Sequence, residues 1–419
     1  DVYKRQINAS YAMCKATGLG NNSLGRVQTP VLAAISRRYR ERENHISSDS
    51  WPIYISLQKD GILFKMRRTQ DLPDKESATM FFQDCKLAHQ AQITGISHSV
   101  KEILPPDLLD LTQLQKEANI RYGFTASEVY DIAQSLYEKK LISYPRTSSR
   151  YLTEDVFDSL PPIMACLLSW ELFPAAKGTG GIDISNLSRH VISAEKANVH
   201  HAIIITGIRP GNLSEKEMQV YRLVAGRMLE TFMAPCRIET TNVEAVCAAQ
   251  HFKAEQTRII EAGWHDVFMR YDMIPTSGYS VKELPEVEKG DTLNVCGCNM
   301  VHKKELPVDP FTDAELVEYM ELNGLGTVSS RTNIIRTLVN RKYIRYSGKY
   351  IVPTPKGMFT YETIRGKKIA DTSLTADWEK QLAGLESGMI TGQDFLNRIR
   401  TLAKEMTDDI FNTYSTKEE

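Results

Sequence analysis

The segment Leu136-Tyr-Glu-Lys-Lys-Leu-Ile-Ser-Tyr144 decides how the fold is predicted, because its pattern returns later in the chain. The second copy is Leu338-Val-Asn-Arg-Lys-Tyr-Ile-Arg-Tyr346, and the same register aligns Thr125 with Thr327. Each copy reads as a helix that ends in two cations and continues into a short strand, the layout of a winged helix-turn-helix. Two such modules favour a nucleic-acid partner. The alternative is a chance similarity between two helix–strand segments.

Helix signals surround both copies. Thr125 and Glu128 have the spacing of a capping box, as do Thr312 and Glu315. Apolar residues at helical spacing, followed by arginines, predict a helix over residues 29–43 with a basic end. A further helix is predicted from about Ser330 to Arg341, with a hairpin turn at Ser347-Gly348 after it.

Strand signals flank the first helical region on both sides. Alternating apolar residues begin at Trp51 and continue in short pieces to about Ile103, and similar texture returns from about Arg237 to Val301. One sheet interrupted by a helical insert is the economical topology. With 419 residues, the chain is predicted to hold two to four domains in a multidomain α+β fold.

The composition excludes some classes of protein and makes others less favoured. The 42% hydrophobic content indicates a globular protein, and no apolar run reaches the roughly 20 residues needed to cross a bilayer. Seven scattered cysteines favour a reducing cytoplasm, and Cys296-Gly-Cys298 reads as a turn rather than half of a metal site. The net charge of −1 argues weakly against nucleic acid, although arginines gather in two clusters. Because the chain starts at Asp1, we expect a fragment of a longer protein.

Tyr144 is the candidate nucleophile. Pro145 biases it away from a helical backbone, and Arg146 supplies a permanent cation suited to a phosphodiester. Thr147 adds a hydroxyl donor for phosphate oxygens. His200 could donate a hydrogen bond to a phosphate, or it could be a histidine satisfied within a core. Taken alone, the Tyr-Pro-Arg sequence is equally consistent with a turn that packs its ring.

The segment Leu141-Ile-Ser-Tyr-Pro-Arg-Thr-Ser-Ser-Arg-Tyr-Leu152 resembles the active-site tyrosine motif of type IA DNA topoisomerases, and it is closest to the bacterial topoisomerase III branch. Further stretches resemble that family in the expected order and extend the resemblance over nearly the whole chain. They are Ser23-Leu-Gly-Arg-Val-Gln-Thr-Pro30, Leu111-Thr-Gln-Leu-Gln-Lys-Glu-Ala-Asn119, His200-His-Ala-Ile-Ile-Ile-Thr206, Gly324-Leu-Gly-Thr-Val-Ser-Ser-Arg331 and Leu374-Thr-Ala-Asp-Trp-Glu379.

The resemblance implies roles for individual residues. Tyr144 would form a covalent bond to the 5′ phosphate of a broken single strand, with Arg146 and His200 stabilising that phosphate. The strand backbone would be held by a second set of residues, which are Arg26, Gln28, Thr147, Thr327, Ser329 and Arg331. Because the covalent bond conserves the energy of the phosphodiester, resealing would need no ATP.

The resemblance also implies an architecture, a toroid with two winged-helix-like helical domains and a hinged β arch. Residues 1–48 with 306–419 would bind the strand, 49–106 with 213–305 would form the arch, and 107–212 would carry Tyr144. The amino-terminal Toprim domain, which holds Mg²⁺ in the family, has no counterpart here, so no metal is expected on this chain alone. We expect a cytoplasmic monomer that binds single-stranded DNA, contacts no membrane and turns over poorly by itself.

Two alternatives remain open at this stage. The chain could be a non-catalytic clamp for single-stranded DNA that kept the fold. It could also be another tyrosine-nucleophile DNA enzyme, such as a recombinase, which would link to the 3′ phosphate instead.

Overall fold

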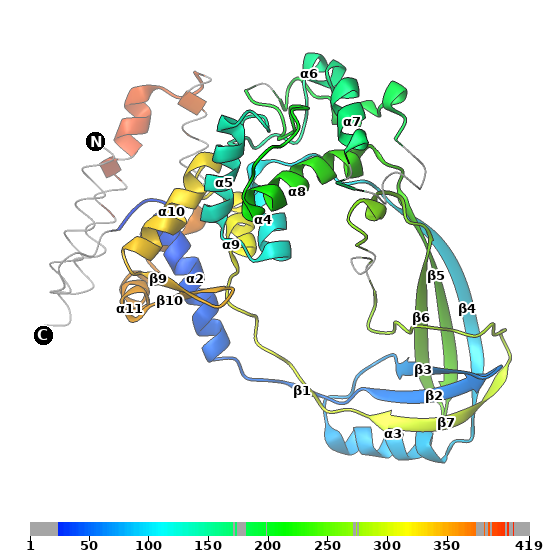
Figure 1. The fold of residues 1–419 in the computed structure, drawn as a ribbon. Helices are drawn as coiled ribbons and strands as arrows, with labels where there is room; N and C mark the ends of the chain where they lie inside the picture. Colours follow the sequence, from blue (N-terminus) through cyan, green and yellow to red (C-terminus); the bar gives the residue numbers. More distant parts are fainter. Residues whose placement is uncertain are drawn as a thin grey trace, which may run out of the picture.

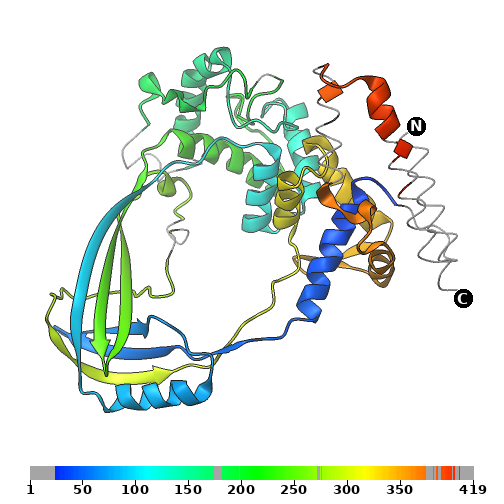
Figure 2. The ribbon, with the colours of Figure 1, turned by 180° about the vertical axis from the view of Figure 1, so that it is seen from behind.

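The elements of the computed structural model are arranged in a ring (Figures 1 and 2). The model describes residues 24–170, 172–173, 182–197, 199–270, 274 and 276–373, together with 381, 384–385, 388–398, 400–401 and 405. Helices and a sheet occupy different parts of the ring, so the predicted α+β class is confirmed. The closing motif at residues 374–379 lies outside the described residues, as do Ser23 and Cys14.

A six-stranded antiparallel sheet closes into a barrel at one side of the ring. The strand order is β2-β3-β6-β5-β4-β7. The alternation of buried and more exposed residues favours these strands, since Ile53, Ile55 and Leu57 all face the barrel core. Trp51 precedes the strand instead of joining it. The strands and the helix α3 beside them are β2 (Ile53–Lys59), β3 (Ile62–Arg68), α3 (Lys75–Leu87), β4 (Gln90–Ile103), β5 (Cys236–Cys247), β6 (Gln250–Glu261) and β7 (Thr292–Met300).

The predicted interruption of one sheet by a helical insert is confirmed. β4 enters the helical region and β5 returns from it, and the two strands pair from Gln92↔Val246 to Ile103↔Cys236. The insert contains α4 (Leu111–Tyr122), α5 (Ala126–Glu138), α6 (Glu154–Asp158), α7 (Leu160–Ser169), η2 (Ile184–Asn186), η3 (Arg189–Val191) and α8 (Glu215–Phe232), and η4 (Gly263–Val267) follows β6.

A first helical core lies above the barrel strands. It joins α4, α5 and α7 with α8, whose residues Tyr221 and Val224 are fully buried there. The expected domain boundaries placed α8 with the arch, whereas its buried face packs with the helices that precede Tyr144. These boundaries stay a prediction.

A second helical core contains segments from both ends of the described chain. α2 (Gln28–Glu43) packs with helices that follow the barrel, and Val31 and Ile35 lie within this core. The predicted helix over residues 29–43 and the predicted hairpin are both confirmed. The later elements are α9 (Asp313–Leu322), α10 (Val328–Asn340), β9 (Ile344–Ser347), β10 (Tyr350–Pro353), α11 (Pro355–Ile364) and η6 (Lys368–Ala370).

The two sequence copies adopt the same backbone at the end of their helices. Lys140 and Lys342 have φ of 60° and 59°, the left-handed conformation. In each copy the next amide donates back to the last apolar helix residue, Leu141 to Leu136 at 2.9 Å and Tyr343 to Leu338 at 3.0 Å. The copies then diverge, because the second forms the β9–β10 hairpin while Ile142 of the first makes a single bridge. Pro145 lacks the amide hydrogen that a longer strand would need.

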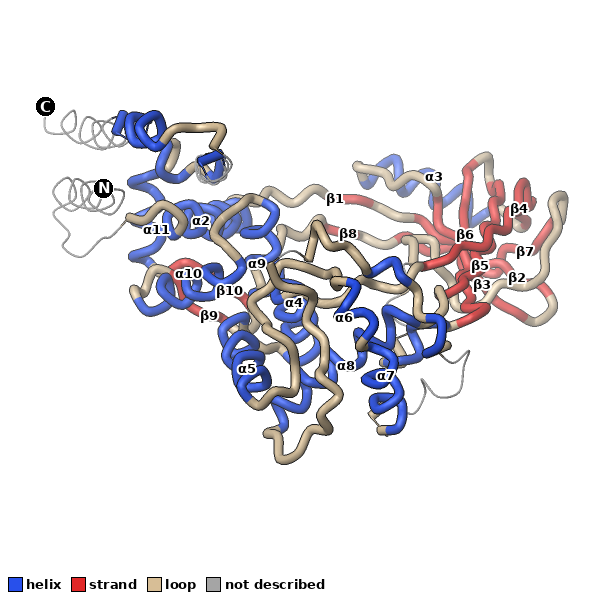
Figure 3. The backbone as a smooth tube through the Cα atoms, turned by 90° about the horizontal axis from the view of Figure 1, so that it is seen from above, coloured by secondary structure: helices blue, strands red, loops and turns tan. Residues whose placement is uncertain are grey.

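The barrel joins the second helical core through a narrow connection. β1 (Asp49–Ser50) pairs with β8 (Lys303–Lys304) over two residues on each strand. Figure 3 shows both strands between the helical part and the barrel. Beside them Trp51 stacks on His302, with ring centroids 4.3 Å apart.

The two helical cores meet through polar contacts that include a buried carboxylate. Asp313 at the start of α9 accepts a hydrogen bond from the Ala126 amide at 3.2 Å and another from the Tyr346 hydroxyl at 3.1 Å. Burial raises the pKa of this carboxyl to about 6, against the two hydrogen bonds that lower it. Its ionised form is therefore destabilising in the folded protein.

We predict that Asp313 makes stability fall as pH rises. Its folded-state pKa lies above the unfolded value of about 3.9, so its contribution is complete below about pH 4 and is lost through about pH 6. Asp313→Asn removes this dependence, which amounts to ~3 kcal/mol at most. Urea unfolding of both proteins at several pH values between about 5 and 7 measures the difference.

Asp309→Asn is the matched control. Hydrogen bonds from Tyr350 and Arg42 lower the pKa of the exposed Asp309 carboxyl. Its titration therefore lies below the measured range, and this variant keeps the slope of the unsubstituted protein. Identical slopes for Asp313→Asn and the unsubstituted chain would contradict the assignment.

Candidate strand-cleavage site

Tyr144 lies on a loop whose backbone is hydrogen-bonded to residues 202–206. The Ser143 amide donates to the Ile204 carbonyl at 2.8 Å, and the Thr206 amide donates to the Leu141 carbonyl at 3.1 Å. The Ser143 hydroxyl donates to the Ala202 carbonyl at 3.1 Å and accepts from the Ile204 amide at 3.0 Å. The predicted non-helical backbone at Tyr144 is confirmed, and Pro145 follows where the pairing stops.

Two rings contact the half-buried Tyr144 ring. His200 lies on one side with its ring centroid 4.4 Å away and the planes inclined by 44°. Tyr137, from the last turn of α5, makes an edge contact at 5.5 Å and 78°. His200 itself is exposed, so the alternative of a buried core histidine is wrong. The structure thus brings together two residues that are far apart in sequence.

Arg146 is held by the neighbouring helix α5. Its Nη2 donates to Gln134 Oε1 at 3.1 Å, and its guanidinium carbon lies 5.0 Å from the centroid of the Tyr130 ring. Its Nε is buried and has no hydrogen-bond partner among the described residues. Gln134 and Tyr130 are one helical turn apart, so they act on the guanidinium from one face of the helix. Sequence reasoning did not identify either residue.

Thr147 connects the tyrosine loop to the histidine. Its buried hydroxyl donates to the His200 carbonyl at 3.2 Å and accepts from the Ser149 amide at 3.0 Å. Its carbonyl accepts from the Leu111 amide at 3.1 Å. In the structure the Thr147 hydroxyl therefore braces the loop, whereas the sequence predicted that it would donate to a phosphate oxygen.

The predicted strand-binding residues at the start of α2 and α10 lie on helices that pack together. Thr327 and Ser329 are exposed, and their hydroxyl oxygens are 3.2 Å apart at the amino end of α10. Gln28 Oε1 accepts from Arg341 Nη1 at 2.8 Å, which links the start of α2 to the end of α10. Arg26 is half-buried and lies two residues before the start of α2. Hydroxyls and amides at a helix amino end suit phosphate oxygens.

Arg331 occupies a different environment from the other strand-binding candidates. It is buried, and its Nη1 donates to Thr112 Oγ1 at 3.1 Å and to Glu321 Oε1 at 3.3 Å. Burial lowers the pKa of this guanidinium, and Glu321 opposes that shift. In this structure Arg331 joins α10 to α4 and α9, so its predicted strand contact stays a prediction.

A second ion pair lies nearby and was not predicted. Arg150 Nε donates to Asp110 Oδ2 at 2.7 Å, while Asp110 Oδ1 caps α4 by accepting from the Gln113 amide at 2.7 Å. Burial raises the Asp110 pKa in opposition to both hydrogen bonds. An aspartate directly before a helix was a readable capping signal, but its pairing with Arg150 was not.

Comparisons with known proteins identify the family of this chain and a solved structure with a similar fold. The fold is similar to that of full-length topoisomerase I from Thermotoga maritima, with a TM-score of 0.70 and 22% identity, over 97% of this chain and 69% of that one. A family model described as DNA topoisomerase matches residues 7–397. The chain belongs to this DNA topoisomerase family, as its resemblance to type IA enzymes predicted.

Relatives at the sequence level carry topoisomerase names. The chain is 30% identical to DNA topoisomerase 3 of Bacillus licheniformis over 93% of its length, and 30% identical to that of Bacillus subtilis over 94%. It is also 30% identical to DNA topoisomerase 1 of Methanocaldococcus jannaschii over 99% of its length. The chain spans 53–57% of the length of these relatives.

The described part of the chain contains neither a group of side chains that could hold a metal ion nor a membrane-spanning helix. No group of three or more His, Cys, Asp and Glu side chains there could hold a metal ion. Among these described residues, the structure shows no candidate for the Mg²⁺ site that the resemblance implies for a whole enzyme. Within the same residues, every helix is too short or too polar to cross a membrane.

We predict a structural role for Arg331. Arg331→Met leaves Glu321 without its cation and lowers the free energy of unfolding by on the order of 3 kcal/mol. Arg336→Met is the matched control from the same helix, because its pair with Asp131 is exposed and is worth at most ~1 kcal/mol. Urea unfolding measures both. Equal, small losses would show that Arg331 is not part of the interface.

Proposed function

We propose that the whole protein opens and reseals one strand of DNA through a bond between Tyr144 and phosphate. The observation that supports this most is the contact of the Tyr144 ring with His200, beside an arginine that α5 holds in place. A tyrosine placed only for packing would not need a neighbouring guanidinium anchored by a glutamine and an aromatic ring. Membership of the DNA topoisomerase family is consistent with this role.

In the proposed reaction, the Tyr144 oxygen attacks a backbone phosphorus atom and the bond from phosphorus to the 3′ oxygen breaks. The phenol loses its proton, the departing 3′ oxygen gains one, and the tyrosine carries the 5′ phosphate. A free phenol ionises near pH 10, so the attack needs cations that stabilise the negative phosphate. Arg146 would supply a guanidinium and His200 a ring N–H for the phosphate oxygens. Resealing is the reverse exchange and consumes no ATP.

The strand would reach Tyr144 along the packed helices α2 and α10. Arg26, Gln28, Thr327 and Ser329 lie at the amino ends of these helices and would contact its phosphates. We assign Mg²⁺ to parts of the whole protein beyond the described residues. We also infer a monomer that acts on single-stranded DNA in the cytoplasm, where its free thiols remain reduced.

We predict that Tyr144→Phe abolishes the covalent adduct in the whole protein. Single-stranded oligonucleotides labelled at either end, trapped with denaturant and resolved on a gel, show which DNA end the protein carries. The unsubstituted protein retains the fragment with the 5′ phosphate. Tyr137→Phe is the control, because this tyrosine packs against Tyr144 but has no role in the bond.

Other outcomes identify the competing functions. An adduct at the 3′ phosphate would indicate a recombinase-like enzyme. Tight DNA binding with no adduct from the whole protein would indicate a non-catalytic clamp.

We also predict that Gln134 positions Arg146. Gln134→Leu slows adduct formation about tenfold in the whole protein, because a hydrogen bond to a charged group is worth about 1.5 kcal/mol. Gln134→Glu keeps an acceptor and restores most of the rate. Glu138→Ala removes the other partner of the Gln134 amide and leaves the rate unchanged. A uniform decrease across all three variants would mean that α5 as a whole had been disturbed.

A further inference from the structure

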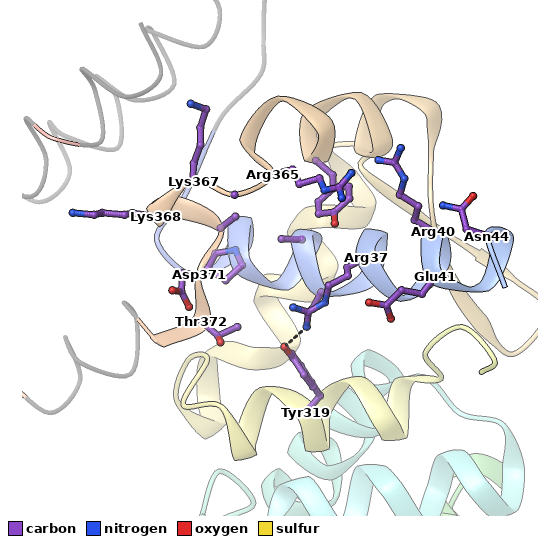
Figure 4. Close-up of a pocket in the computed structure, with 16 residues that line it drawn as sticks. Arg37, Arg40, Glu41, Asn44, Tyr319, Arg365, Lys367, Lys368, Asp371 and Thr372 are labelled. Carbon is purple, nitrogen blue, oxygen red and sulfur yellow. Dashed lines mark hydrogen bonds between the residues drawn. The ribbon is translucent and has the colours of Figure 1, made fainter. Parts of the chain in front are cut away.

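Three cysteines that lie far apart in the sequence come together at the barrel. They are Cys85 near the end of α3, Cys247 at the end of β5 and Cys298 on β7. Figures 1 and 2 show α3 along the outside of the barrel, next to β7. The polar pocket beside α2 that Figure 4 shows has no cysteine among its described lining residues. The three thiols are therefore a separate feature of the fold, and the proposed reaction at Tyr144 does not use them.

Cys85 is the central member of this thiol cluster, which consists of Cys85, Cys247 and Cys298. It is fully buried, and its thiol interacts with the thiols of both other residues. Cys298 Sγ also donates a weak hydrogen bond, 3.9 Å long, to the carbonyl oxygen of Phe82, which lies about one turn before Cys85 on α3. Cys247 belongs to the same apolar core as Cys85. The packing of α3 on the barrel thus makes the three sulfur atoms neighbours.

The three thiols differ in exposure and in acidity. Cys298 is half-buried, whereas Cys85 and Cys247 are almost completely enclosed. The hydrogen bond from Cys85 lowers the pKa of the Cys298 thiol, while contact with Cys85 and burial raise the pKa of Cys247. The hydrogen bond with Cys247 lowers the pKa of Cys85, but contact with Cys298 and burial outweigh it and raise that pKa to about 11. Because the thiolate is the reactive form, Cys298 is the most reactive member of the cluster.

The described residues provide no group that could hold a metal ion, so the chemistry of the cluster is that of the thiols themselves. Hydrogen peroxide is small enough to reach a half-buried sulfur atom. The Cys298 sulfur attacks one peroxide oxygen, the O–O bond breaks and water leaves, so that Cys298 becomes a sulfenic acid. The Cys85 sulfur then attacks the Cys298 sulfur, the S–O bond breaks, and a second water carries away the hydroxyl and the Cys85 proton. In total two thiols lose two electrons and two protons, and one peroxide becomes two waters.

We propose that the thiol cluster is a peroxide-sensitive site, at which Cys298 reacts first and Cys85 completes a disulfide. The new bond joins α3 to β7 and closes a loop over residues 86–297, which contains the whole helical insert. Both residues are free thiols in this structure. In a reducing compartment the disulfide is transient, because cellular thiols reduce it again.

The test exposes the reduced 419-residue chain to a small molar excess of hydrogen peroxide under native conditions. The remaining thiols are then blocked with iodoacetamide, and peptide masses are mapped without reductant. We expect a linked pair of peptides that contain Cys85 and Cys298, lighter by two hydrogens than the sum of the separate peptides. Dithiothreitol removes the link.

Two variants separate the steps, and a third is the matched control. Cys298→Ser prevents the link and leaves the buried Cys85 reduced. Cys85→Ala stops the reaction at the sulfenic acid of Cys298, which dimedone traps as a stable adduct. Cys296→Ser is the control, because Cys296 is exposed on the same strand but its Sγ contacts Gln58 Oε1 and the Asn294 carbonyl. This variant forms the link as the unsubstituted chain does.

The unsubstituted chain decides the pairing by itself, so the test holds even where a variant unfolds. Cys85 that stays fully reduced after peroxide treatment overturns the proposal, and so does a link from Cys85 to Cys247 with Cys298 still reduced. Oxidation of Cys296 without oxidation of Cys298 also overturns it, because exposure and not the neighbouring thiol would then set the reactivity.

Discussion

The pairing of residues 141–144 with residues 202–206 is the constraint on which the proposed chemistry depends. Ser143, directly before Tyr144, takes part in this pairing through both its backbone amide and its side-chain hydroxyl. Thr147 continues the same contact to His200. The Tyr144 phenol and the Arg146 guanidinium, from one loop, and the His200 imidazole, from a distant part of the sequence, are thereby held in one small region, with the Tyr144 and His200 rings in contact.

Local signals in the sequence predicted much of the secondary structure. Capping boxes at Thr125 and Thr312 depend on residues three positions apart, and both form as predicted. The copy relationship also held at the backbone level, where Lys140 and Lys342 share one conformation. These features were readable because neighbouring residues determine them.

Long-range partners left no such signal. Nothing in the periodicity around Gln134 distinguishes a residue that holds Arg146 from one that faces solvent. Arg331 shows the converse difficulty, since its motif implied a strand contact and the structure pairs it with Glu321. A cation near a helix amino end reads the same from sequence whether its partner is a phosphate or a carboxylate on another helix. Only the packing of α9 against α4 separates the two cases.

The short β1–β8 ladder has a mechanical consequence for the ring. At this ladder the two segments of the chain are held together by two paired residues on each strand. The stacked rings of Trp51 and His302 and the contact between Asp49 and His302 add to this pairing. The β4–β5 ladder at the other junction is much longer. If the ring is bent, the deformation would therefore concentrate at the short β1–β8 ladder, which would act as a hinge. The long β4–β5 ladder would stay rigid.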